Sequence, residues 1–241
     1  MKLKVEFFHD VICSFCYPMS YRMRMIEKEM DNVEIIHRSY ALAPDAKTYE
    51  MQFGSRENVK DEIVNHWVYA NENDDLHRFN IEGMKEKDFL FPTSMNPLKA
   101  CKAAYLTSGD NAYWDVFDAL QKAFFTDSKN IESEEVIFDI VKGCDLDFDT
   151  FKKHYEDKDT VLKIEEDFYL AYQYGIESVP ALVMDGKYLM SGAQPYDVIK
   201  DSLNEIYQEK LNNIIKTNNE LESKGEEGNS CDLVDGEWKC E

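Results

Sequence analysis

The sequence has few basic residues and no long apolar run. Its 27 Lys and Arg stand against 48 Asp and Glu, which gives a formal net charge of −21. Such an acidic surface repels phosphate backbones and anionic lipid, which argues against nucleic acid and membrane partners. No segment approaches the ~20 apolar residues of a membrane span, and residues 1–10 lack the apolar run of a signal peptide. We therefore expect a soluble, cytoplasmic protein.

Cysteine is also scarce, with six in the chain, and two of them form the motif Cys13-Ser14-Phe15-Cys16. A C-x-x-C also supplies half of many zinc sites, but here it follows an apolar strand-like run and opens a helix-like stretch. At a helix N-terminus, free N–H groups and the helix dipole stabilise a thiolate. The motif therefore predicts a redox dithiol in which Cys13 attacks a disulfide and Cys16 resolves the mixed disulfide.

The order of periodic segments predicts the fold. Leu3–Phe8 reads as a strand, apolar residues from Phe15 to Met30 recur at helical spacing, and Val33–Tyr40 reads as a second, parallel strand. From about Ala43 to Gly175 the pattern is helical, with apolar stripes formed by Tyr113, Phe117, Leu120 and Phe124, by Val136, Ile137, Ile140 and Val141, and by Val161, Ile164, Phe168 and Tyr172.

Strand character returns after this helical block. Ala181–Met184, the turn pair Asp185-Gly186 and Lys187–Met190 predict a hairpin. A final helix with apolar residues between Val198 and Ile215 is expected to fray into the polar run 218–230. The sequence therefore predicts an α/β, thioredoxin-like fold with a large helical insertion and a short C-terminal extension. The expected parts are residues 1–42 with 175–217, the insertion 43–174, and the tail 218–241.

A proline stands at the entrance to the hairpin, in Ser178-Val179-Pro180-Ala181. An ordinary trans-proline at the start of a strand is one interpretation. With a C-x-x-C upstream and a hairpin downstream, we favour a cis-proline packed beside the dithiol, as in thioredoxin-like proteins. Because proline lacks an N–H, the backbone of Val179 can then turn outward and pair with a substrate strand.

These segments resemble the DsbA superfamily, and in particular its FrnE-like branch. The resemblance rests on Phe8–Tyr17, on Val179–Val183 and on Asp185–Tyr188 with Ser191–Gln194. It implies a thiol-disulfide oxidoreductase with Cys13 as nucleophile, Cys16 as resolving thiol and Pro180 as cis-proline. Family members often carry Pro-Trp or Pro-His between the cysteines. The Ser14-Phe15 pair leaves open whether the enzyme oxidises, reduces or isomerises disulfides.

Two residues in front of the dithiol are supporting candidates. Asp10 is expected to cap the helix, with proton transfer as the alternative role, and His9 is expected to stabilise the thiolate when it is protonated. No organic cofactor and no metal are expected. The expected partners are protein or small-molecule disulfides and dithiols, together with a cellular thiol reductant or oxidant.

The C-terminal cysteines form a second candidate pair. If Asp235-Gly236 is a two-residue turn, Cys231 stands opposite Cys240, with the pairs Asp232–Lys239, Leu233–Trp238 and Val234–Glu237 between them. Directly opposed residues have Cα atoms ~4.5 to 5.5 Å apart, which a disulfide accepts. The pair is either a second redox couple that exchanges electrons with Cys13 and Cys16, or a local staple.

Two other functions compete with the oxidoreductase. The first is a glutathione-dependent isomerase or transferase of the kappa type, which shares the expected fold but usually has serine at the position of Cys13. The second is a zinc-binding or chaperone-like module in which Cys13, Cys16, Cys231 and Cys240 hold a metal. Cys101 is expected to be a small buried residue, and Cys144 has no evident partner.

Overall fold

The computed structural model describes residues 2–225, 231–234 and 237–240. The chain divides into two compact units, Met1–Tyr196 and Asp197–Glu241. The first unit contains a four-stranded sheet in the order β2-β1-β3-β4. Strands β1 (Leu3–His9) and β2 (Val33–Ser39) are parallel, whereas β3 (Ala181–Met184) and β4 (Tyr188–Ser191) are antiparallel to their neighbours. The predicted βαβ unit and hairpin are therefore confirmed.

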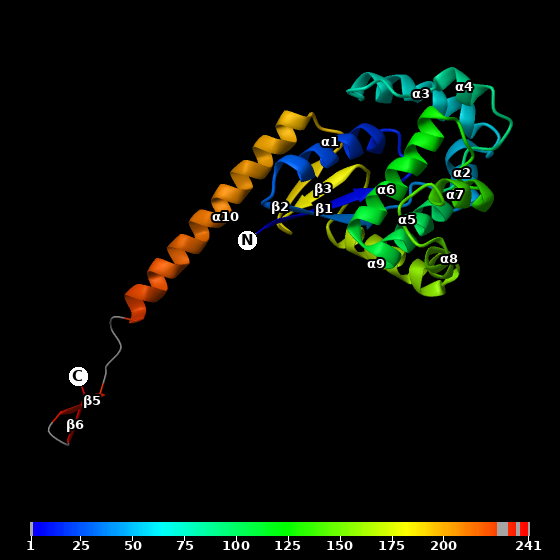
Figure 1. Cartoon of the computed structure of the whole chain (residues 1–241). Helices are drawn as coiled ribbons and strands as arrows, with labels where there is room; N and C mark the ends of the chain where they lie inside the picture. Colours follow the sequence, from blue (N-terminus) through cyan, green and yellow to red (C-terminus); the bar gives the residue numbers. More distant parts are fainter. Residues whose placement is uncertain (1, 226–230, 235–236, 241) are drawn as a thin grey trace. The chain divides into compact units, whose positions relative to one another are not determined.

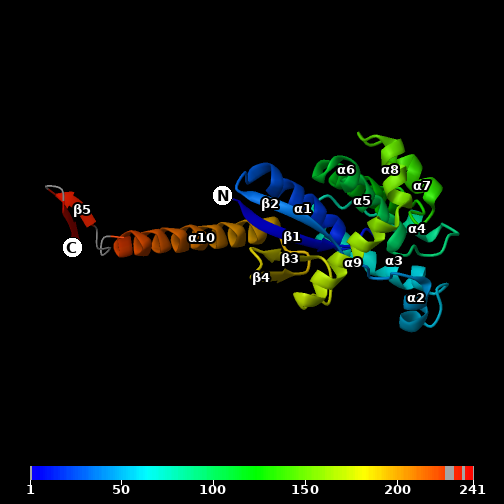
Figure 2. The ribbon, with the colours of Figure 1, turned by 90° about the horizontal axis from the view of Figure 1, so that it is seen from below.

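Helix α1 (Cys16–Glu29) connects β1 to β2, and its methionines Met19 and Met23 are fully buried. Eight α-helices follow β2 and precede β3 among the described residues, and seven of them gather beyond the end of the sheet toward which β1 runs (Figures 1 and 2). These are α2 (Ala46–Phe53), α3 (Val59–Asn73), α4 (Ile81–Lys85), α5 (Met95–Ser108), α6 (Asp110–Gln121), α7 (Glu134–Val141) and α8 (Phe148–Glu156). Helix α9 (Lys158–Gln173) then leads back to the sheet. The expected helical insertion is confirmed.

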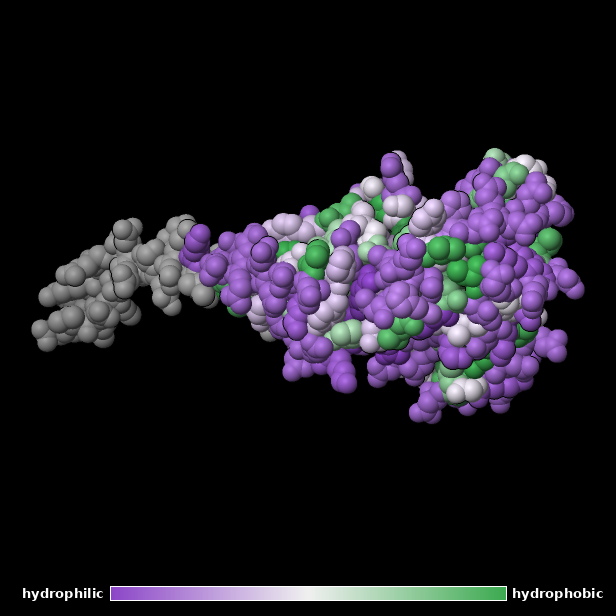
Figure 3. Space-filling model, turned by 90° about the horizontal axis from the view of Figure 1, so that it is seen from above, coloured by the Kyte–Doolittle hydropathy of each residue, from purple (hydrophilic) through white to green (hydrophobic). Residues whose placement is uncertain are grey.

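The insertion has its own aromatic core. Trp67 on α3 is fully buried and packs edge-on against Phe79, Phe91, Phe124 and Phe125 at ring-centroid distances of 5.0 to 6.4 Å. Phe124 and Phe125 lie in a π-helical turn, Lys122–Thr126, which continues α6. Aromatic pairs of this kind stabilise a core beyond the area that they bury. The surface shown in Figure 3 is predominantly hydrophilic over the first unit, in keeping with the charge.

Three details differ from the sequence prediction. Tyr172, assigned to an apolar stripe, is 82% exposed, because the inward face of α9 is formed by Thr160, Ile164, Asp167 and Ala171. The β3–β4 loop has three residues rather than two, since Met184 pairs with Tyr188 and the Lys187 N–H closes the turn on the Met184 carbonyl. Asp185 and Gly186 do adopt positive φ, at 52° and 68°.

The third difference is the length of the last helix. Helix α10 (Tyr196–Gly225) continues through the first part of the run that was expected to fray. Residues 218–224 contain no proline or glycine, and polar helix formers such as Glu and Lys extend a helix without an apolar face. The second unit also contains β5 (Cys231–Val234) and β6 (Glu237–Cys240). Among the described residues, no helix is both long and apolar enough for a bilayer crossing.

Candidate active site

The dithiol lies in the turn that joins the end of β1 to α1. The helix begins at Cys16, so Cys13 precedes it by three residues rather than occupying its first turn. The Cys16 N–H donates to the Cys13 carbonyl at 3.1 Å, a bond between residues three apart, whereas an α-helix needs four. Cys13 and Cys16 are both free thiols, and they are 4% and 0% exposed.

The two sulfur atoms have different surroundings. The Cys16 N–H also lies 3.2 Å from Cys13 Sγ, and Cys13 Sγ is 3.5 Å from the backbone carbonyl of Val179. Cys13 therefore sits beside a backbone donor at the helix N-terminus, the place where negative charge on sulfur is stabilised. Of the intervening residues, Ser14 is half-buried and Phe15 is 37% exposed.

Cys16 is the less exposed thiol of the pair. Burial raises the pKa of its thiol well above the usual value, and the hydrogen bond and charge of Cys13 raise it further. Cys16 therefore stays protonated until a base or a reacting partner removes its proton.

Pro180 faces the dithiol from the other end of the first unit's sequence. The Val179–Pro180 peptide bond is cis, the conformation that the sequence predicts. The Pro180 carbonyl accepts the Gly192 N–H at 2.8 Å, and Val179 packs on a buried cluster that includes Phe8 and Val183. Strands β1 and β3 are direct neighbours, so the sheet brings the segments after β1 and before β3 together.

Asp10 does not cap α1, so the expected role is wrong. The N-cap residue is Phe15, and its side chain makes no capping hydrogen bond. The Asp10 carboxylate instead accepts the Ile12 N–H at 3.3 Å, the Leu42 N–H at 2.8 Å and the Ser94 hydroxyl at 2.6 Å. It is fully buried, and burial raises its pKa to about 6 although these hydrogen bonds oppose the shift. The protonation of Asp10 therefore changes around pH 6, and the carboxyl is mostly ionised at neutral pH.

Ser94 is a site residue that sequence reasoning missed. It is fully buried at the N-cap of α5, where its hydroxyl donates to Asp10 and accepts the Ala43 N–H at 3.0 Å rather than capping the helix. A serine before an apolar helical stripe signals a cap. Its partner lies 84 residues away in the sequence, which no local pattern reveals.

We expect Ser94→Ala to raise the pKa of Asp10 further and to destabilise the fold by about 1 to 2 kcal/mol, because a buried carboxylate loses a donor. Denaturant unfolding at several pH values and the pH profile of Cys16 alkylation measure the two effects. Ser202→Ala is the matched control, since that exposed hydroxyl donates only to a carbonyl of its own helix, at Val198. An unshifted pH profile in Ser94→Ala contradicts the role given to Ser94.

His9 does not supply positive charge to the dithiol, contrary to expectation. It is fully buried, and its Nε2 lies 3.1 Å from His37 Nδ1 and 3.4 Å from the Tyr113 hydroxyl. Burial lowers its pKa well below the usual value, helped by the charge of Lys102. The ring is therefore neutral and packs in the core against Phe117 at 4.1 Å between centroids.

Four further cysteines lie in the described residues. Cys101 is fully buried in α5, as predicted, and half-buried Cys144 donates to the Ile140 carbonyl. Cys231 pairs with Cys240 across β5 and β6, in the predicted register with all three intervening pairs, whereas the turn residues 235–236 lie outside the described residues. Within the described ranges, no group of three or more His, Cys, Asp or Glu is placed to hold a metal ion.

Comparison with known proteins agrees with this arrangement. The family model described as the DSBA-like thioredoxin domain matches residues 4–204. A candidate protein disulfide isomerase from Nitrosomonas europaea has a TM-score of 0.69 at 17% identity, over 87% of this chain and 99% of that chain. A candidate DsbA oxidoreductase from Streptomyces coelicolor has a TM-score of 0.67 at 21% identity, over 86% and 91%.

A third similar structure is the cytosolic disulfide reductase DsbM from Pseudomonas aeruginosa. Its TM-score is 0.65 at 14% identity, with 87% of this chain and 98% of that chain covered, and it was also solved with GSH. At these identities the solved structures establish the shared fold. No curated protein matches the sequence.

The thioredoxin-like sheet, the C-x-x-C after β1 and the cis-proline that faces it define the class of thioredoxin-like disulfide oxidoreductases. Within that class, the chain belongs to the family of DSBA-like thioredoxin domains, whose model spans most of its length.

Proposed function

We propose that this protein catalyses thiol–disulfide exchange with Cys13 as the nucleophile and Cys16 as the resolving thiol. The observation that carries the proposal is the position of Cys13 Sγ, 3.2 Å from the Cys16 amide nitrogen and 3.5 Å from the Val179 carbonyl. The amide stabilises a thiolate, and the Val179 backbone lies next to Cys13, where a substrate chain can pair with it.

The proposed exchange proceeds in two steps. The Cys13 thiolate attacks one sulfur of a substrate disulfide, so that a Cys13–substrate bond forms while the substrate bond breaks and releases a thiolate. Cys16 then loses its proton and attacks Cys13 Sγ, which forms the Cys13–Cys16 disulfide and releases the second substrate thiol. The substrate gains two electrons and the dithiol loses two. The reverse sequence oxidises a substrate dithiol.

Asp10 is the proposed proton acceptor for Cys16. The raised pKa of the Cys16 thiol requires a base in the second step, and the pKa of Asp10, about 6, leaves the carboxyl mostly ionised at neutral pH. The charge of Asp10 is among the causes that raise the pKa of Cys16, which agrees with their proximity. Ser94 and the Leu42 amide hold the carboxylate in position.

A redox titration tests the proposed function. The full chain is equilibrated in glutathione buffers of graded potential, free thiols are trapped by alkylation, and each cysteine is read by mass spectrometry. We expect Cys13 and Cys16 to titrate together and reversibly, while Cys101 stays reduced because it is fully buried and has no partner cysteine among the described residues. Failure of the pair to titrate rejects the oxidoreductase and favours a structural or zinc-binding role.

The proposal extends to the cellular compartment of the protein, its branch of the family and its redox partners. DsbM, whose fold is similar, is a cytosolic disulfide reductase that was also solved with GSH. We infer that this chain also works in the cytoplasm as an FrnE-like protein and uses a low-molecular-weight thiol such as glutathione to recycle its dithiol. Its substrates are then disulfides of proteins or small molecules. Recycling of oxidised Cys13–Cys16 by glutathione, followed by stopped-flow Trp fluorescence, checks the reductant.

Cys231 and Cys240 are proposed as a second redox pair. They stand directly opposite each other in the β5–β6 pair, where Cα atoms are ~4.5 to 5.5 Å apart, within reach of a disulfide. In the proposed relay, the Cys231–Cys240 dithiol reduces the Cys13–Cys16 disulfide and itself becomes a disulfide, so that two electrons pass between the pairs.

The division of the chain into a thioredoxin-like part (1–42 with 175–217), an inserted helical part (43–174) and a tail (218–241) remains a prediction.

Deleting residues 229–241 is expected to lower multiple-turnover disulfide exchange about fivefold while single-turnover attack by Cys13 is unchanged, because only recycling loses its relay. Cys231→Ser with Cys240→Ser is the matched variant, which keeps the hairpin sequence and removes only the sulfur chemistry. Unaltered turnover in both variants identifies the pair as a local staple.

A further inference from the structure

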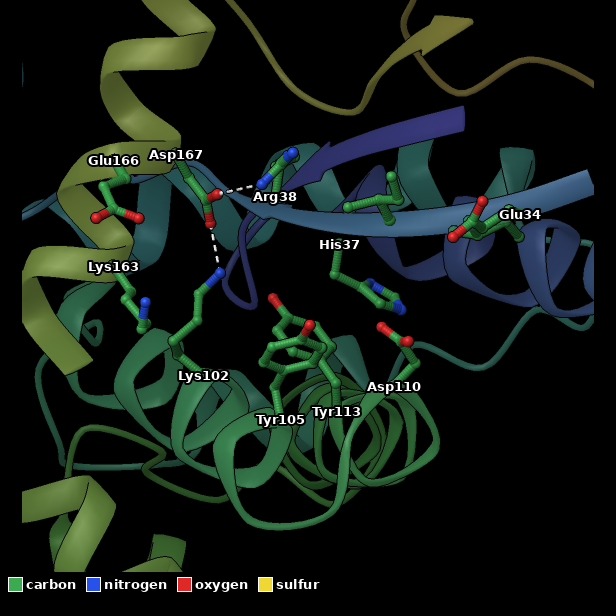
Figure 4. A pocket seen from close by; sticks show the side chains of 12 residues that line it. Glu34, His37, Arg38, Lys102, Tyr105, Asp110, Tyr113, Lys163, Glu166 and Asp167 are labelled. Atoms are coloured by element: carbon green, nitrogen blue, oxygen red, sulfur yellow. Dashed lines mark hydrogen bonds and ion pairs between the residues drawn. The ribbon is translucent and has the colours of Figure 1, made fainter. Parts of the chain in front are cut away.

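Ion pairs join the helical insertion both to the sheet and to α1. At the sheet, Asp167 on α9 accepts from Lys102 Nζ at 2.6 Å and from Arg38 Nη1 at 3.2 Å (Figure 4). At α1, the partners come from the segment 73–78, which lies at the end of α3 and before α4. This second set of contacts reaches the helix that begins at Cys16.

The segment 73–78 holds α1 near its middle through a buried arginine. Arg22 is 3% exposed, and its guanidinium pairs with Asp75 at 2.8 Å and donates to the Asn73 side chain at 3.0 Å. It also donates to the Gln194 carbonyl, which follows β4, at 3.0 Å. These bonds fix the segment on α1.

The same segment contacts the first turn of α1 through Arg78. Arg78 Cζ lies 3.8 Å from the centre of the ring of Tyr17, the residue that follows Cys16, and Arg78 Nη2 donates to the Tyr17 carbonyl at 3.1 Å. The Thr126 hydroxyl donates to the Arg78 carbonyl at 2.9 Å and lies 3.0 Å from the Tyr17 hydroxyl. The insertion therefore holds Tyr17 at its ring, its hydroxyl and its backbone.

Arg78 is itself held by a buried carboxylate. The Asp74 side chain is fully buried and accepts from Arg78 Nη2 at 2.7 Å, from Nε at 2.9 Å and from the Arg78 backbone N–H at 2.8 Å. A two-point bond between a guanidinium and a carboxylate fixes the plane of the guanidinium. This orientation places one face of the group on the Tyr17 ring while Nη2 still reaches the Tyr17 carbonyl.

Tyr17 connects these contacts to the dithiol. Its N–H donates to the Ser14 carbonyl at 3.2 Å, and its peptide bond joins it to Cys16, whose own N–H lies 3.2 Å from Cys13 Sγ. A donor that is already held in place stabilises a charge more than one that must first be oriented. The position of Tyr17 therefore affects how well the Cys16 amide stabilises charge on Cys13.

We propose that Arg78 is a positioning residue for the dithiol, because it holds Tyr17 and so keeps the Cys16 amide directed at Cys13 Sγ. This inference rests on the proposed function, in which the thiolate of Cys13 is the nucleophile, and it assigns part of the reactivity of that thiolate to the helical insertion. Arg78 acts through Tyr17 and not on the sulfur atoms.

The test is the pH profile of Cys13 alkylation in the full chain, read by mass spectrometry. Asp74→Asn combined with Arg78→Met removes the contact with Tyr17 and leaves no unpaired charge in the buried position of Asp74. We expect the pH midpoint of alkylation to rise by at least about half a pH unit, because the thiolate loses a fixed donor. The equilibrium with glutathione should shift toward the disulfide for the same reason.

A milder variant keeps the test valid if the double variant does not fold. Thr126→Val removes the partner of the Tyr17 hydroxyl and leaves the pair of Asp74 and Arg78 in place. The pH midpoint of Cys13 alkylation should rise in this variant too, by a smaller amount. Arg78→Lys keeps the charge, but a single ammonium cannot make the forked contact, so its midpoint should also rise.

Arg56→Met combined with Glu132→Gln is the matched control. Arg56 pairs with Glu132 and donates to the Phe91 carbonyl at 2.8 Å, so it makes the same kind of contact within the insertion and away from α1. This control should lower the stability of the protein without moving the alkylation midpoint.

An unchanged midpoint in the double variant, in Thr126→Val or in Arg78→Lys overturns the proposal, and so does an equal shift in the control. Failure of Cys13 and Cys16 to titrate with glutathione in the wild-type chain is a different result, because it rejects the proposed function itself.

Discussion

Replacing Cys13 with serine is expected to lower the rate of disulfide exchange at least about 1,000-fold, the largest effect of any single substitution in this chain. A serine hydroxyl does not ionise near neutral pH, so it cannot attack a disulfide sulfur and form the mixed intermediate that Cys16 would resolve. Cys13 lies in the hydrogen-bonded turn that precedes α1 and not in the helix itself. The substituted protein should therefore still fold. Reduction of a model disulfide, followed by the release of thiol, measures the loss.

Cys16→Ser separates the two steps. The variant keeps the Cys13 thiol and the Cys16 amide that donates to it, so the first attack should proceed and the mixed disulfide should accumulate without being resolved. Mass spectrometry of the intact protein detects the trapped adduct. Cys144→Ser is the matched control, because that thiol is half-buried and bonded only to the Ile140 carbonyl, and it should retain activity within about twofold. Full activity in Cys13→Ser rejects the mechanism.

Replacing Asp10 with asparagine is expected to stabilise the protein at alkaline pH and not at acidic pH. The folded-state pKa of Asp10 is about 6, above the ordinary value of 3.8. Because the pKa is raised, the native state binds the proton of Asp10 more tightly than the unfolded state does. This contribution to the free energy of unfolding is present at acidic pH and is lost as the pH rises through about 6. Asparagine never ionises, so the stability difference between variant and wild type should change by about 2.4 kcal/mol between pH 4 and pH 8.

The same substitution should slow the chemistry. Asparagine cannot accept a proton, so resolution by Cys16 should slow about 10- to 100-fold at neutral pH, and the dependence on a group with a pKa of about 6 should disappear. Urea unfolding at pH 4, 6 and 8 and the pH profile of mixed-disulfide resolution measure the two effects. Asp139→Asn is the control: its exposed carboxylate pairs with Lys142, and it should change stability by less than about 0.5 kcal/mol. A pH-independent difference for Asp10→Asn removes Asp10 as the titrating group.

Much of the fold was predictable because its signals are local. The apolar run of β1 and its parallel partner β2, the helical stripes between Ala43 and Gly175, and the Asp185-Gly186 turn each follow from spacing that fixes a period or a turn. The β5–β6 register is of the same kind, since a short turn determines which residues oppose each other. The prediction was wrong at the end of α10, where a polar composition was taken to end the helix. It was also wrong at Tyr172, because residue spacing does not show which face of a helix the neighbouring elements bury.

The sequence by itself determined the Cys13–Cys16 motif, its place after a strand and the proline before the hairpin, because a strand, a C-x-x-C and an X-Pro are each written in a few consecutive residues. Only the tertiary structure decided how the side chains around that pair behave. Asp10 became a buried acid held by Ser94, and His9 became a neutral core residue bonded to His37. Burial and long-range hydrogen bonds set these properties, and both depend on partners that lie 28 to 84 residues away in the chain.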